Sequence, residues 1–346
     1  MNISKESVMS PKGDITLYTL TNKSGAQVVL SSLGAGINKI IVPDKAGNMA
    51  DVILGYENPC DYDNDGPCSG KTPGRYANRI KHGKIIVNGK EYSLPINNGP
   101  NHLHGGPEGF QNRIWDSEAK GNSVVFTLTS PDGEMGYPGE LKAKVTYTWD
   151  NDDRLTIDYE ATTDAATYVN LTNHAYFNLK GHNKGNVLDQ VLQLNCSQYL
   201  PTDPSEAPLG NIEPVAGTPM DFTSPKAIGK DINEDFEPLH IGKGYDHCYV
   251  VDGWVKGQLK EVGTLTDPAS GRKLTISSTQ PGAQVYTGNW LTGSPKGKDG
   301  MEYHDYDLVA IECQGFPDAP NQPAFPSQLL VPGETYRQTI IYKFDA

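Results

Sequence analysis

The stretch LKAKVTYTW at residues 141–149 places apolar side chains at every second position. Side chains on a β-strand point alternately to its two faces, so this pattern predicts a strand with one face in the core and the other toward solvent. The stretch LTIDYE at residues 155–160 shows the same alternation. Half-buried strands of this kind are typical of antiparallel sheets, and they indicate an all-β fold.

The alternation recurs along the whole chain, and turn signals separate the strands. KIIVNGKEYSL at residues 84–94 holds Asn88-Gly89 between two strand-like runs, which predicts a β-hairpin. DPASG at residues 267–271 is a second turn between strands. The further predicted strands are AQVVLS (26–31), SVVFTLT (123–129), KLTIS (273–277) and QTIIYKF (338–344).

Helices and domain boundaries are hard to find in this sequence. Residues 231–239 favour a helical turn or two, and residues 201–230, rich in Pro, Asp and Ser, predict a long surface loop. A chain of 346 residues is long enough for two domains, but large β folds often exceed about 200 residues, and no linker or repeat divides this one. We predict a single domain over residues 1–346, a large antiparallel β-sandwich whose loops carry the functional site.

The composition is acidic, with 42 Asp and Glu against 29 Lys and Arg and a net charge of −13. Because the basic residues form no block, nucleic acid and anionic membranes are poor partners, and a neutral ligand such as a sugar fits better. No apolar run approaches the length of a membrane span, and the first 13 residues, MNISKESVMSPKG, lack the apolar core of a signal peptide. We expect a cytoplasmic protein, or an extracytoplasmic one if a signal peptide has been removed.

The five cysteines are odd in number and widely spaced, and none forms a CxxC pair. This spacing argues against a zinc ribbon and against a dense disulfide framework. Buried free thiols are the expected state. Cys60 and Cys68 lie close enough in the sequence to leave a bridge between them open.

Four segments combine titratable, polar and glycine residues in a way that strands alone do not require. Glu312 follows the apolar run at residues 308–311, where alternation places it in or near the core. A buried carboxylate has to be paired or functional, so Glu312 is either half of a structural ion pair or a catalytic group. The four segments are GRYANRI (74–80), NHLHGG (101–106), NLTNHAYFNL (170–179) and VAIECQGF (309–316).

The histidines of these segments have structural and functional interpretations. His174 lies in a strand-like segment, where a buried histidine is more often a core residue than a catalyst. His102 and His104 are two residues apart and would share one face of a strand. With Glu108 they form the pattern HxHxxxE, similar to a cupin metal site, although the glycine spacing differs and Pro107 disturbs a continuing strand. A metal-dependent, cupin-like enzyme is therefore one alternative.

Taken together, the motifs resemble those of one family. In addition to the four segments, the chain contains YDH (245–247), GAQVY (282–286), IECQGFPDAPNQPAFPS (311–327) and LVPGETY (330–336). In order and spacing they are similar to the motifs of the galactose mutarotase (aldose 1-epimerase) family, across residues 27–344. The resemblance implies a galactose mutarotase-like supersandwich, which is one large antiparallel β-sandwich with an open sugar cleft. It also implies an isomerase that interconverts the α and β anomers of free hexoses, such as galactose and glucose, without a cofactor or a metal.

The resemblance also implies roles for individual residues. Glu312 is the catalytic base, His174 is the general acid, and His104 contacts the sugar near the reacting carbon. At ordinary pKa values a glutamate is ionised near pH 7 and a histidine titrates close to it, so the pair would begin as carboxylate and imidazolium. The residues implied in sugar binding are Asn78, Arg79, Tyr176, Asp246 and Gln284, and the candidates for stacking on the apolar face of the sugar are Tyr176, Phe177, Trp290 and Phe316.

Two further alternatives keep the fold and change the function. A hexose 6-phosphate epimerase would need a basic cluster for the phosphate, whereas the motif segments hold few basic residues beyond Arg75 and Arg79. A non-catalytic sugar-binding protein would lack the acid or the base, and both His174 and Glu312 are present. The expected partner is a free aldohexose, and the sequence leaves both a monomer and a homodimer open.

Overall fold

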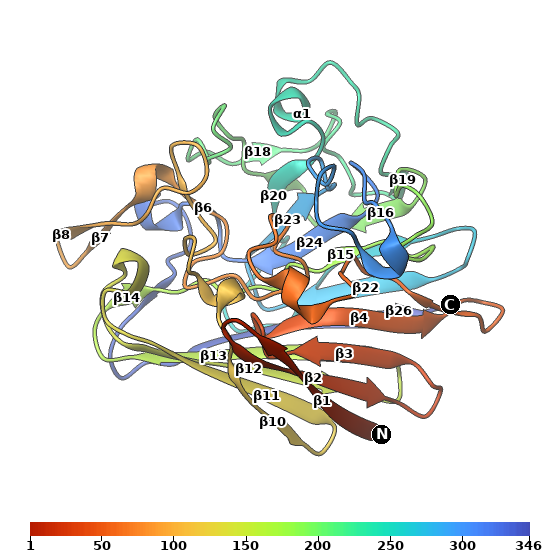
Figure 1. Cartoon of the computed structure of the whole chain (residues 1–346). Helices are drawn as coiled ribbons and strands as arrows, with labels where there is room; N and C mark the ends of the chain where they lie inside the picture. The colour runs from red at the N-terminus through yellow and green to blue at the C-terminus, as the bar shows by residue number, and fades with distance from the viewer.

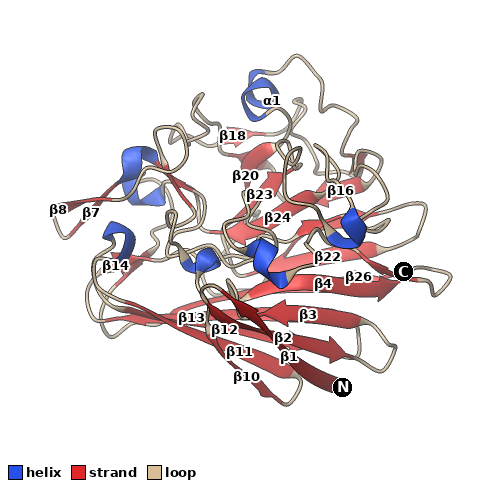
Figure 2. Ribbon diagram, in the orientation of Figure 1, coloured by secondary structure: helices blue, strands red, loops and turns tan.

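The computed structural model describes residues 1–346, and three antiparallel sheets form its framework (Figure 1). Strands dominate the ribbon, and the short helices lie in the connections between them (Figure 2). The largest sheet has nine strands, in the order β10 (Asp116–Lys120), β11 (Ser123–Ser130), β12 (Leu141–Trp149), β13 (Arg154–Thr163), β26 (Tyr336–Asp345), β22 (Lys273–Ser278), β21 (Lys260–Thr266), β16 (Val191–Leu194) and β19 (Lys226–Ala227).

Two smaller sheets and three strand pairs complete the fold. The five-stranded sheet follows chain order, with β1 (Asn2–Ser10), β2 (Gly13–Thr21), β3 (Gln27–Ser31), β4 (Gly36–Pro43) and β5 (Met49–Asp51). The six-stranded sheet has the order β15 (Tyr176–Phe177), β24 (Val309–Gln314), β23 (Gly282–Tyr286), β20 (Asp246–Val250), β17 (Gln198–Tyr199) and β18 (Glu213–Pro214). The pairs are β6 (Arg79–Ile80) with β9 (His102–Leu103), β7 (Lys84–Val87) with β8 (Lys90–Ser93), and β14 (Thr167–Tyr168) with β25 (Leu329–Leu330).

Helical structure is limited to short segments. The α-helix is α1 (Glu237–Gly242), so the helical turn expected at residues 231–239 begins later and extends beyond them. The 3-10 turns are Pro59–Tyr62, Lys81–Gly83, Phe110–Asn112, Glu134–Gly136, Lys298–Gly300 and Ala319–Asn321. No helix has the length and apolar character needed to span a membrane.

The strands expected from alternation are confirmed. β12 coincides with residues 141–149, and its side chains alternate between buried and more exposed positions. It pairs with β11 on one side and with β13 on the other. The predicted hairpin joins β7 to β8 through Asn88 and Gly89, whose φ angles of 51° and 78° suit the type I′ turn that Asn-Gly favours.

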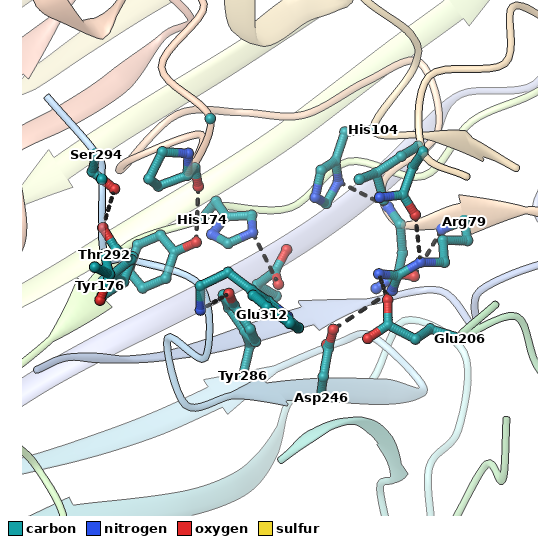
Figure 3. A pocket seen from close by; sticks show the side chains of 18 of the residues that line it. Arg79, His104, His174, Tyr176, Glu206, Asp246, Tyr286, Thr292, Ser294 and Glu312 are labelled. Carbon is teal, nitrogen blue, oxygen red and sulfur yellow. Dashed lines mark hydrogen bonds and ion pairs between the residues drawn. The ribbon is translucent and has the colours of Figure 1, made fainter. Parts of the chain in front are cut away.

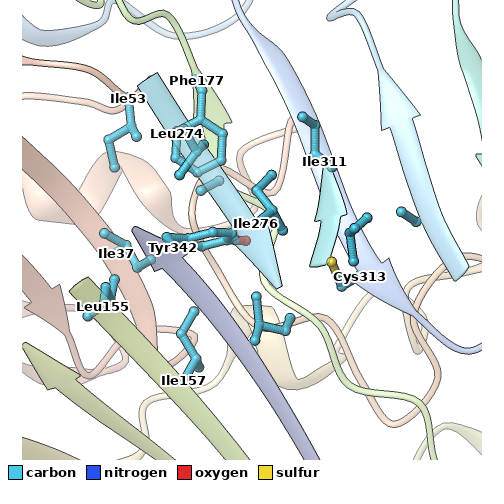
Figure 4. Close-up of a cluster of buried hydrophobic side chains, with 14 of the residues drawn as sticks. Ile37, Ile53, Leu155, Ile157, Phe177, Leu274, Ile276, Ile311, Cys313 and Tyr342 are labelled. Atoms are coloured by element: carbon cyan, nitrogen blue, oxygen red, sulfur yellow. The ribbon is translucent and has the colours of Figure 1, made fainter. Parts of the chain in front are cut away.

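One hydrophobic core lies between the nine-stranded sheet and the two smaller sheets. Figure 4 shows side chains of β22, β26 and β13 meeting those of β15 and β24. The rings of Phe177 and Tyr342 pack edge to face with their centroids 5.2 Å apart. The five-stranded sheet covers another part of the same core, where Tyr18 packs against Phe126. Each large apolar side chain buried in this way contributes about 1.5–3 kcal/mol, which stabilises the stacked arrangement.

The structure also shows the predicted loop at residues 201–230 and the state of the five cysteines. Residues 201–230 are irregular apart from the two-residue strands β18 and β19 and one isolated bridge, which confirms a loop. It is not a surface loop throughout, because Val215, Met220, Phe222 and Ile228 are buried in the main hydrophobic core. Cys60 and Cys68 are not bridged, and all five cysteines are free thiols. Four of the five are buried, as expected for small apolar side chains, and Cys60 is partly exposed.

A buried ion pair shapes the connection between β5 and β6. Lys71 Nζ lies 2.6 Å from Asp65 Oδ1, and the two side chains are 1% and 0% exposed. Lys71 Nζ also donates to the main-chain oxygen of Tyr62 at 2.5 Å. The backbone beside the lysine carries two further bonds of 2.9 Å, from His174 N–H to Lys71 C=O and from Gly70 N–H to His174 C=O. The ion pair therefore holds the segment to which residue 174 is hydrogen-bonded.

We expect Lys71→Met to lower the free energy of unfolding by about 3–5 kcal/mol, because it leaves the Asp65 carboxylate buried without its partner. Urea denaturation followed by tryptophan fluorescence measures this change. The double variant Lys71→Met/Asp65→Asn removes both charges and should recover most of the loss. A single variant as stable as the parent protein would show that the pair does not hold this segment.

Candidate active site

The six-stranded sheet turns one face to the core and the other to an open cleft. Cross-strand neighbours share a face, and the register places Gln284 opposite Glu312 and Tyr286 opposite Asp246. Residues two apart on one strand also share a face, so these four side chains project from the same side of β24, β23 and β20. Tyr176 of β15 joins them from the neighbouring strand. The sheet therefore places side chains from four strands beside the cleft.

The cleft over this face has a volume of about 710 Å³, which is enough for a monosaccharide. Its other walls come from the β6–β9 region, from the loop after β17 and from residues 290–295. Figure 3 shows the side chains of these separate segments turned toward one another. The ionisable side chains that line the cleft are Arg79, His104, His174, Glu206, Asp246, Tyr176, Tyr286 and Glu312.

His174 reaches the cleft from irregular backbone just before β15, and not from a strand as its sequence context predicts. The polar residues next to it are buried and fasten this backbone. Thr172 Oγ1 donates to Cys313 C=O at 2.7 Å, and Asn173 Nδ2 donates to Gly70 C=O at 2.7 Å. The polar character of NLTNHAYFNL is therefore largely structural, since it fixes the position of the histidine.

His174 and Glu312 meet at the wall of the cleft. His174 Nε2 lies 3.3 Å from Glu312 Oε1, and the two side chains are only 6% and 2% exposed. Burial lowers the pKa of His174 to about 4. Burial also raises the pKa of Glu312 well above its ordinary value, with a further increase from Asp246 and an opposing effect from Arg79.

These pKa shifts reverse the protonation expected from the sequence. Ordinary pKa values suggest a carboxylate beside an imidazolium, whereas burial favours the carboxylic acid of Glu312 and the neutral ring of His174. Both arrangements hold one proton on the pair. Burial therefore changes where the proton rests and leaves the number of protons on the pair unchanged.

His104 enters the cleft from the turn that follows β9. Its φ of 53° takes the backbone out of the strand, so His102 and His104 do not share a face, contrary to expectation. Asn78 N–H donates to His104 Nδ1 at 3.1 Å, and a ring nitrogen that accepts a hydrogen bond carries no proton. The neutral ring is therefore protonated on Nε2. Burial and the nearby His174 lower the pKa of His104 well below its ordinary value, which keeps this ring neutral.

The structure contradicts the interpretation of the HxHxxxE pattern as a metal site. His102 is buried outside the cleft, with Nδ1 2.7 Å from the Pro95 carbonyl oxygen and Nε2 2.8 Å from the Tyr137 hydroxyl. Both of its nitrogens are therefore engaged. Glu108 is exposed and does not line the cleft.

A second group of possible metal ligands lies beside the cleft. His104, His174 and Glu312 offer ligand atoms that lie within 4.8 Å of one another. A metal ligand needs a free lone pair, and Nδ1 of His104 uses its lone pair to accept from Asn78 N–H while Nε2 carries the proton. The hydrogen bonding of this trio therefore favours proton chemistry over metal binding.

Arg79 is held by three neighbours at the side of the cleft (Figure 3). Its Nε donates to Asn98 Oδ1 at 3.0 Å, one terminal nitrogen forms an ion pair with Glu206, and the other lies 3.7 Å from Asp246 Oδ2. Gln284 Nε2 donates to Asp246 Oδ1 at 2.6 Å. Gln284 is buried and does not line the cleft, which differs from the expectation that it would. Its contact instead orients Asp246.

Tyr176 supports the histidine more than it offers a hydroxyl to the cleft. Its hydroxyl donates to the Pro67 carbonyl oxygen at 2.9 Å. Its ring centroid lies 4.9 Å from that of His174, with 32° between the planes. The tyrosine therefore limits the ring orientations open to His174.

Of the other aromatic candidates for stacking on a sugar, some line the cleft and others are buried. Trp290 lines the cleft and is 64% exposed, and Tyr286 lines it from β23. Phe177 and Phe316 lie in buried hydrophobic clusters and do not reach the cleft, so neither can stack on a bound sugar. Trp290 is thus the most exposed aromatic side chain beside the cleft, and Lys243 Nζ lies over its ring, 4.4 Å from the centroid.

Sequence reasoning missed Glu206 and Asn98 and found only part of the wall at residues 290–295. Glu206 lies in the irregular loop between β17 and β18, and Asn98 lies in the turn before β9, where no periodicity indicates a direction for a side chain. The sequence signal available for residues 290–295 is Trp290, an aromatic residue in a stretch that contains Gly, Asn, Thr and Ser.

Comparison with known proteins identifies the family and the fold that this chain resembles. The family model for aldose 1-epimerase matches residues 16–343. The chain is 43% identical to galactose mutarotase of Homo sapiens over 318 residues, which cover 92% of this chain and 91% of that protein. It is 36% identical to aldose 1-epimerase of Escherichia coli K12 over 343 residues, which cover 98% of each. The crystal structure of an aldose epimerase homologue from C. elegans is similar with a TM-score of 0.87 and 32% identity, over 99% of both chains.

Proposed function

The chain belongs to the aldose 1-epimerase family and is an isomerase that interconverts the α and β anomers of a free aldose, and on that premise we propose that His174 and Glu312 carry the proton transfers. The observation that carries this proposal is the 3.3 Å contact between His174 Nε2 and Glu312 Oε1 beside the cleft. The hydroxyl oxygen O1 and the ring oxygen O5 are bonded to the same anomeric carbon, so two groups this close can each reach one of them.

Ring opening removes one proton and delivers another. Glu312 as carboxylate takes the proton from the O1 hydroxyl, while His174 as imidazolium gives a proton to O5. The C1–O5 bond breaks, its electron pair stays with O5, and O1 becomes the carbonyl oxygen of the aldehyde. Rotation about C1–C2 presents the other face of the aldehyde. On closure His174 takes the proton back from the O5 hydroxyl and Glu312 returns one to O1, which gives the other anomer.

A single shared proton serves both directions. Opening leaves Glu312 protonated and His174 neutral, which is the state that burial favours in the free protein. Opening of a cyclic sugar starts from the other state, in which Glu312 is ionised and His174 is protonated. The proton of Glu312 reaches His174 by passing across the 3.3 Å contact between them. The pair therefore needs no proton from the solvent during a turnover.

We assign His104 the role of a fixed hydrogen-bond donor to the reacting oxygens. The bond from Asn78 N–H sets its tautomer, so Nε2–H is the group available to a ligand. A donor already oriented before the reaction stabilises charge that develops on oxygen without having to reorient. Because the pKa of His104 is lowered well below its ordinary value, the ring does not compete with His174 as an acid.

The remaining cleft residues bind and orient the sugar in this proposal. Arg79 and Asp246 supply a charged donor and a charged acceptor for hydroxyl groups, and the Asn78 side chain lines the cleft beside them. Gln284 acts through Asp246, and Tyr176 acts through His174. We propose free hexoses such as galactose and glucose as substrates, because several of the relatives are named galactose mutarotases.

We also propose that residues 1–346 form one domain. The main hydrophobic cluster draws on residues from Tyr18 to Phe344 and includes strands of all three large sheets, and this continuity supports the proposal. The monomeric or homodimeric state and the cytoplasmic location stay predictions.

We expect Glu312→Gln to lower kcat by about 10²–10⁴-fold, because the amide keeps the shape of the side chain and cannot accept a proton. The midpoint of thermal unfolding should stay the same or rise, since the variant removes a carboxyl group that burial disfavours as an ion. Polarimetry of freshly dissolved α-D-galactose measures the rate. Glu334→Gln, at an exposed turn, is the matched control and should behave like the parent protein. Near-normal turnover in Glu312→Gln would remove this residue from the mechanism.

The pH profile of kcat/KM should have a wide plateau. Activity falls on the acid side when His174 takes up a second proton on the pair, and its lowered pKa places that limb near pH 4 instead of near 6.5. Activity falls on the alkaline side when the shared proton leaves, and the raised pKa of Glu312 places that limb above the ordinary glutamate range. Stopped-flow polarimetry at constant ionic strength measures both limbs. An acid limb near pH 6.5 would contradict this account of the pair.

A further inference from the structure

The ionisable groups around the cleft are unbalanced in charge. Glu206 and Asp246 supply two carboxylates, whereas Arg79 supplies the single permanent cation and no lysine lines the cleft. The Glu312–His174 pair holds one proton and adds no net charge, and burial lowers the pKa of His104 and keeps that ring neutral, so neither offsets the excess. A ligand that carries a negative charge therefore enters a site that already holds an excess of acidic groups.

The one cation is not free to bind an anion. Arg79 donates from Nε to Asn98, forms an ion pair with Glu206 and faces Asp246 at 3.7 Å. The three nitrogens of the guanidinium are thus each directed at a protein oxygen. An anionic ligand would have to displace one of the two carboxylates, and the displaced carboxylate would remain in the cleft beside it.

The carboxylate of Glu206 is held in place by its loop. Asp203 accepts from the Ser205 N–H at 2.8 Å and forms an ion pair of 2.7 Å with Lys81, which follows β6. Asn101 Nδ2 donates to the Ser205 carbonyl oxygen at 3.0 Å, which ties the loop to the segment before β9. Glu206, with a φ of 62°, projects from this fixed turn, and its side chain remains 19% exposed. Its charge is therefore a built part of the cleft wall.

We propose that Glu206 is a specificity-determining residue that makes the cleft reject aldoses bearing a negative charge, such as hexuronic acids and hexose phosphates, in favour of neutral and cationic aldoses. This inference rests on the proposed function of the same cleft. Like charges brought together in a partly dry site repel strongly, whereas a neutral hydroxyl group can donate to either carboxylate. Glu206 occupies two roles at once, because it neutralises Arg79 and presents a negative surface to the ligand.

Glu206 is the acidic residue best suited to this role. Glu312 is engaged with His174, and Asp246 is oriented by Gln284 for contact with sugar hydroxyls. Burial and Asp246 raise the pKa of Glu206, while the ion pair with Arg79 opposes that shift. Exclusion of anions should therefore strengthen as the pH rises through this pKa and the carboxylate becomes ionised.

A matched series of sugars isolates the effect of charge. D-galacturonate, D-galactose and 6-amino-6-deoxy-D-galactose share the pyranose ring and carry a negative, a neutral and a positive group at C6. Anomerisation of each is followed by NMR exchange spectroscopy in the parent protein and in Glu206→Gln, Glu206→Asp and Glu213→Gln. Glu206→Gln removes the charge and keeps an oxygen for Arg79, and Glu206→Asp keeps the charge. Glu213→Gln removes a charge from an exposed position of the same loop, outside the cleft.

The quantity compared is kcat/KM for galacturonate divided by kcat/KM for galactose. We expect this ratio to rise at least about tenfold in Glu206→Gln, since one like charge near the ligand is removed. It should stay low in Glu206→Asp and in Glu213→Gln, and the corresponding ratio for the amino sugar should fall in Glu206→Gln. Where turnover of galacturonate is too slow to follow, its inhibition constant against galactose gives the same comparison.

Two results would overturn the inference. One is an unchanged galacturonate ratio in Glu206→Gln, and the other is an equal rise in Glu206→Gln and Glu213→Gln, which would indicate a general effect of net charge. Failure of the proposed function itself gives a different result, because the parent protein would then show no turnover of galactose. Circular dichroism of each variant confirms that the rates refer to folded protein.

Discussion

Burial of the contact between His174 and Glu312 is the constraint on which the rest of the cleft depends. Taking either charge out of water costs several kcal/mol, so the pair is stable only where the surrounding structure holds it in place. The cross-strand register of the six-stranded sheet fixes the carboxyl group, and main-chain bonds to Gly70 and Lys71 fix the histidine. The buried Lys71–Asp65 ion pair in turn holds the segment to which His174 is hydrogen-bonded. Several polar groups outside the cleft therefore serve to keep two groups close together within it.

The division of labour between strands and loops follows from what each can fix. Strands of a sheet set the direction of a side chain by alternation and its neighbours by register, and they carry Glu312, Gln284, Tyr286 and Asp246. Turns supply directions that a strand cannot. His104 and Asn78 both have positive φ, and their mutual hydrogen bonds close a compact turn that points an imidazole N–H toward the cleft. The sheet therefore holds the base and the turns hold the donors, so the cleft can open between the two.

How far the sequence predicts this structure depends on the range of the interaction. The half-buried strands and the Asn88-Gly89 hairpin follow from local alternation and turn chemistry, and both are confirmed. The residues assigned to catalysis follow from the resemblance of the motifs to those of the aldose 1-epimerase family, and the structure brings His104, His174 and Glu312 together from three distant segments. The contribution of Glu206 could not be predicted, because it depends on a loop that is fixed by Lys81 and Asn101, more than a hundred residues earlier in the chain. The protonation of the pair also differs from the one that ordinary pKa values predict, because those values take no account of burial.

The same balance of terms explains why this pair suits a reaction that runs in both directions. At 3.3 Å, the attraction between a carboxylate and an imidazolium is roughly 5 kcal/mol at an effective dielectric constant of about 20, and desolvation of the two charges opposes it by several kcal/mol. The charged and neutral states of the pair are therefore closer in free energy than either term alone would make them. Ring opening starts from one state and closure from the other, so a large gap between them would slow one direction. The depth at which the pair is buried and the charges of Arg79 and Asp246 beside it adjust that gap.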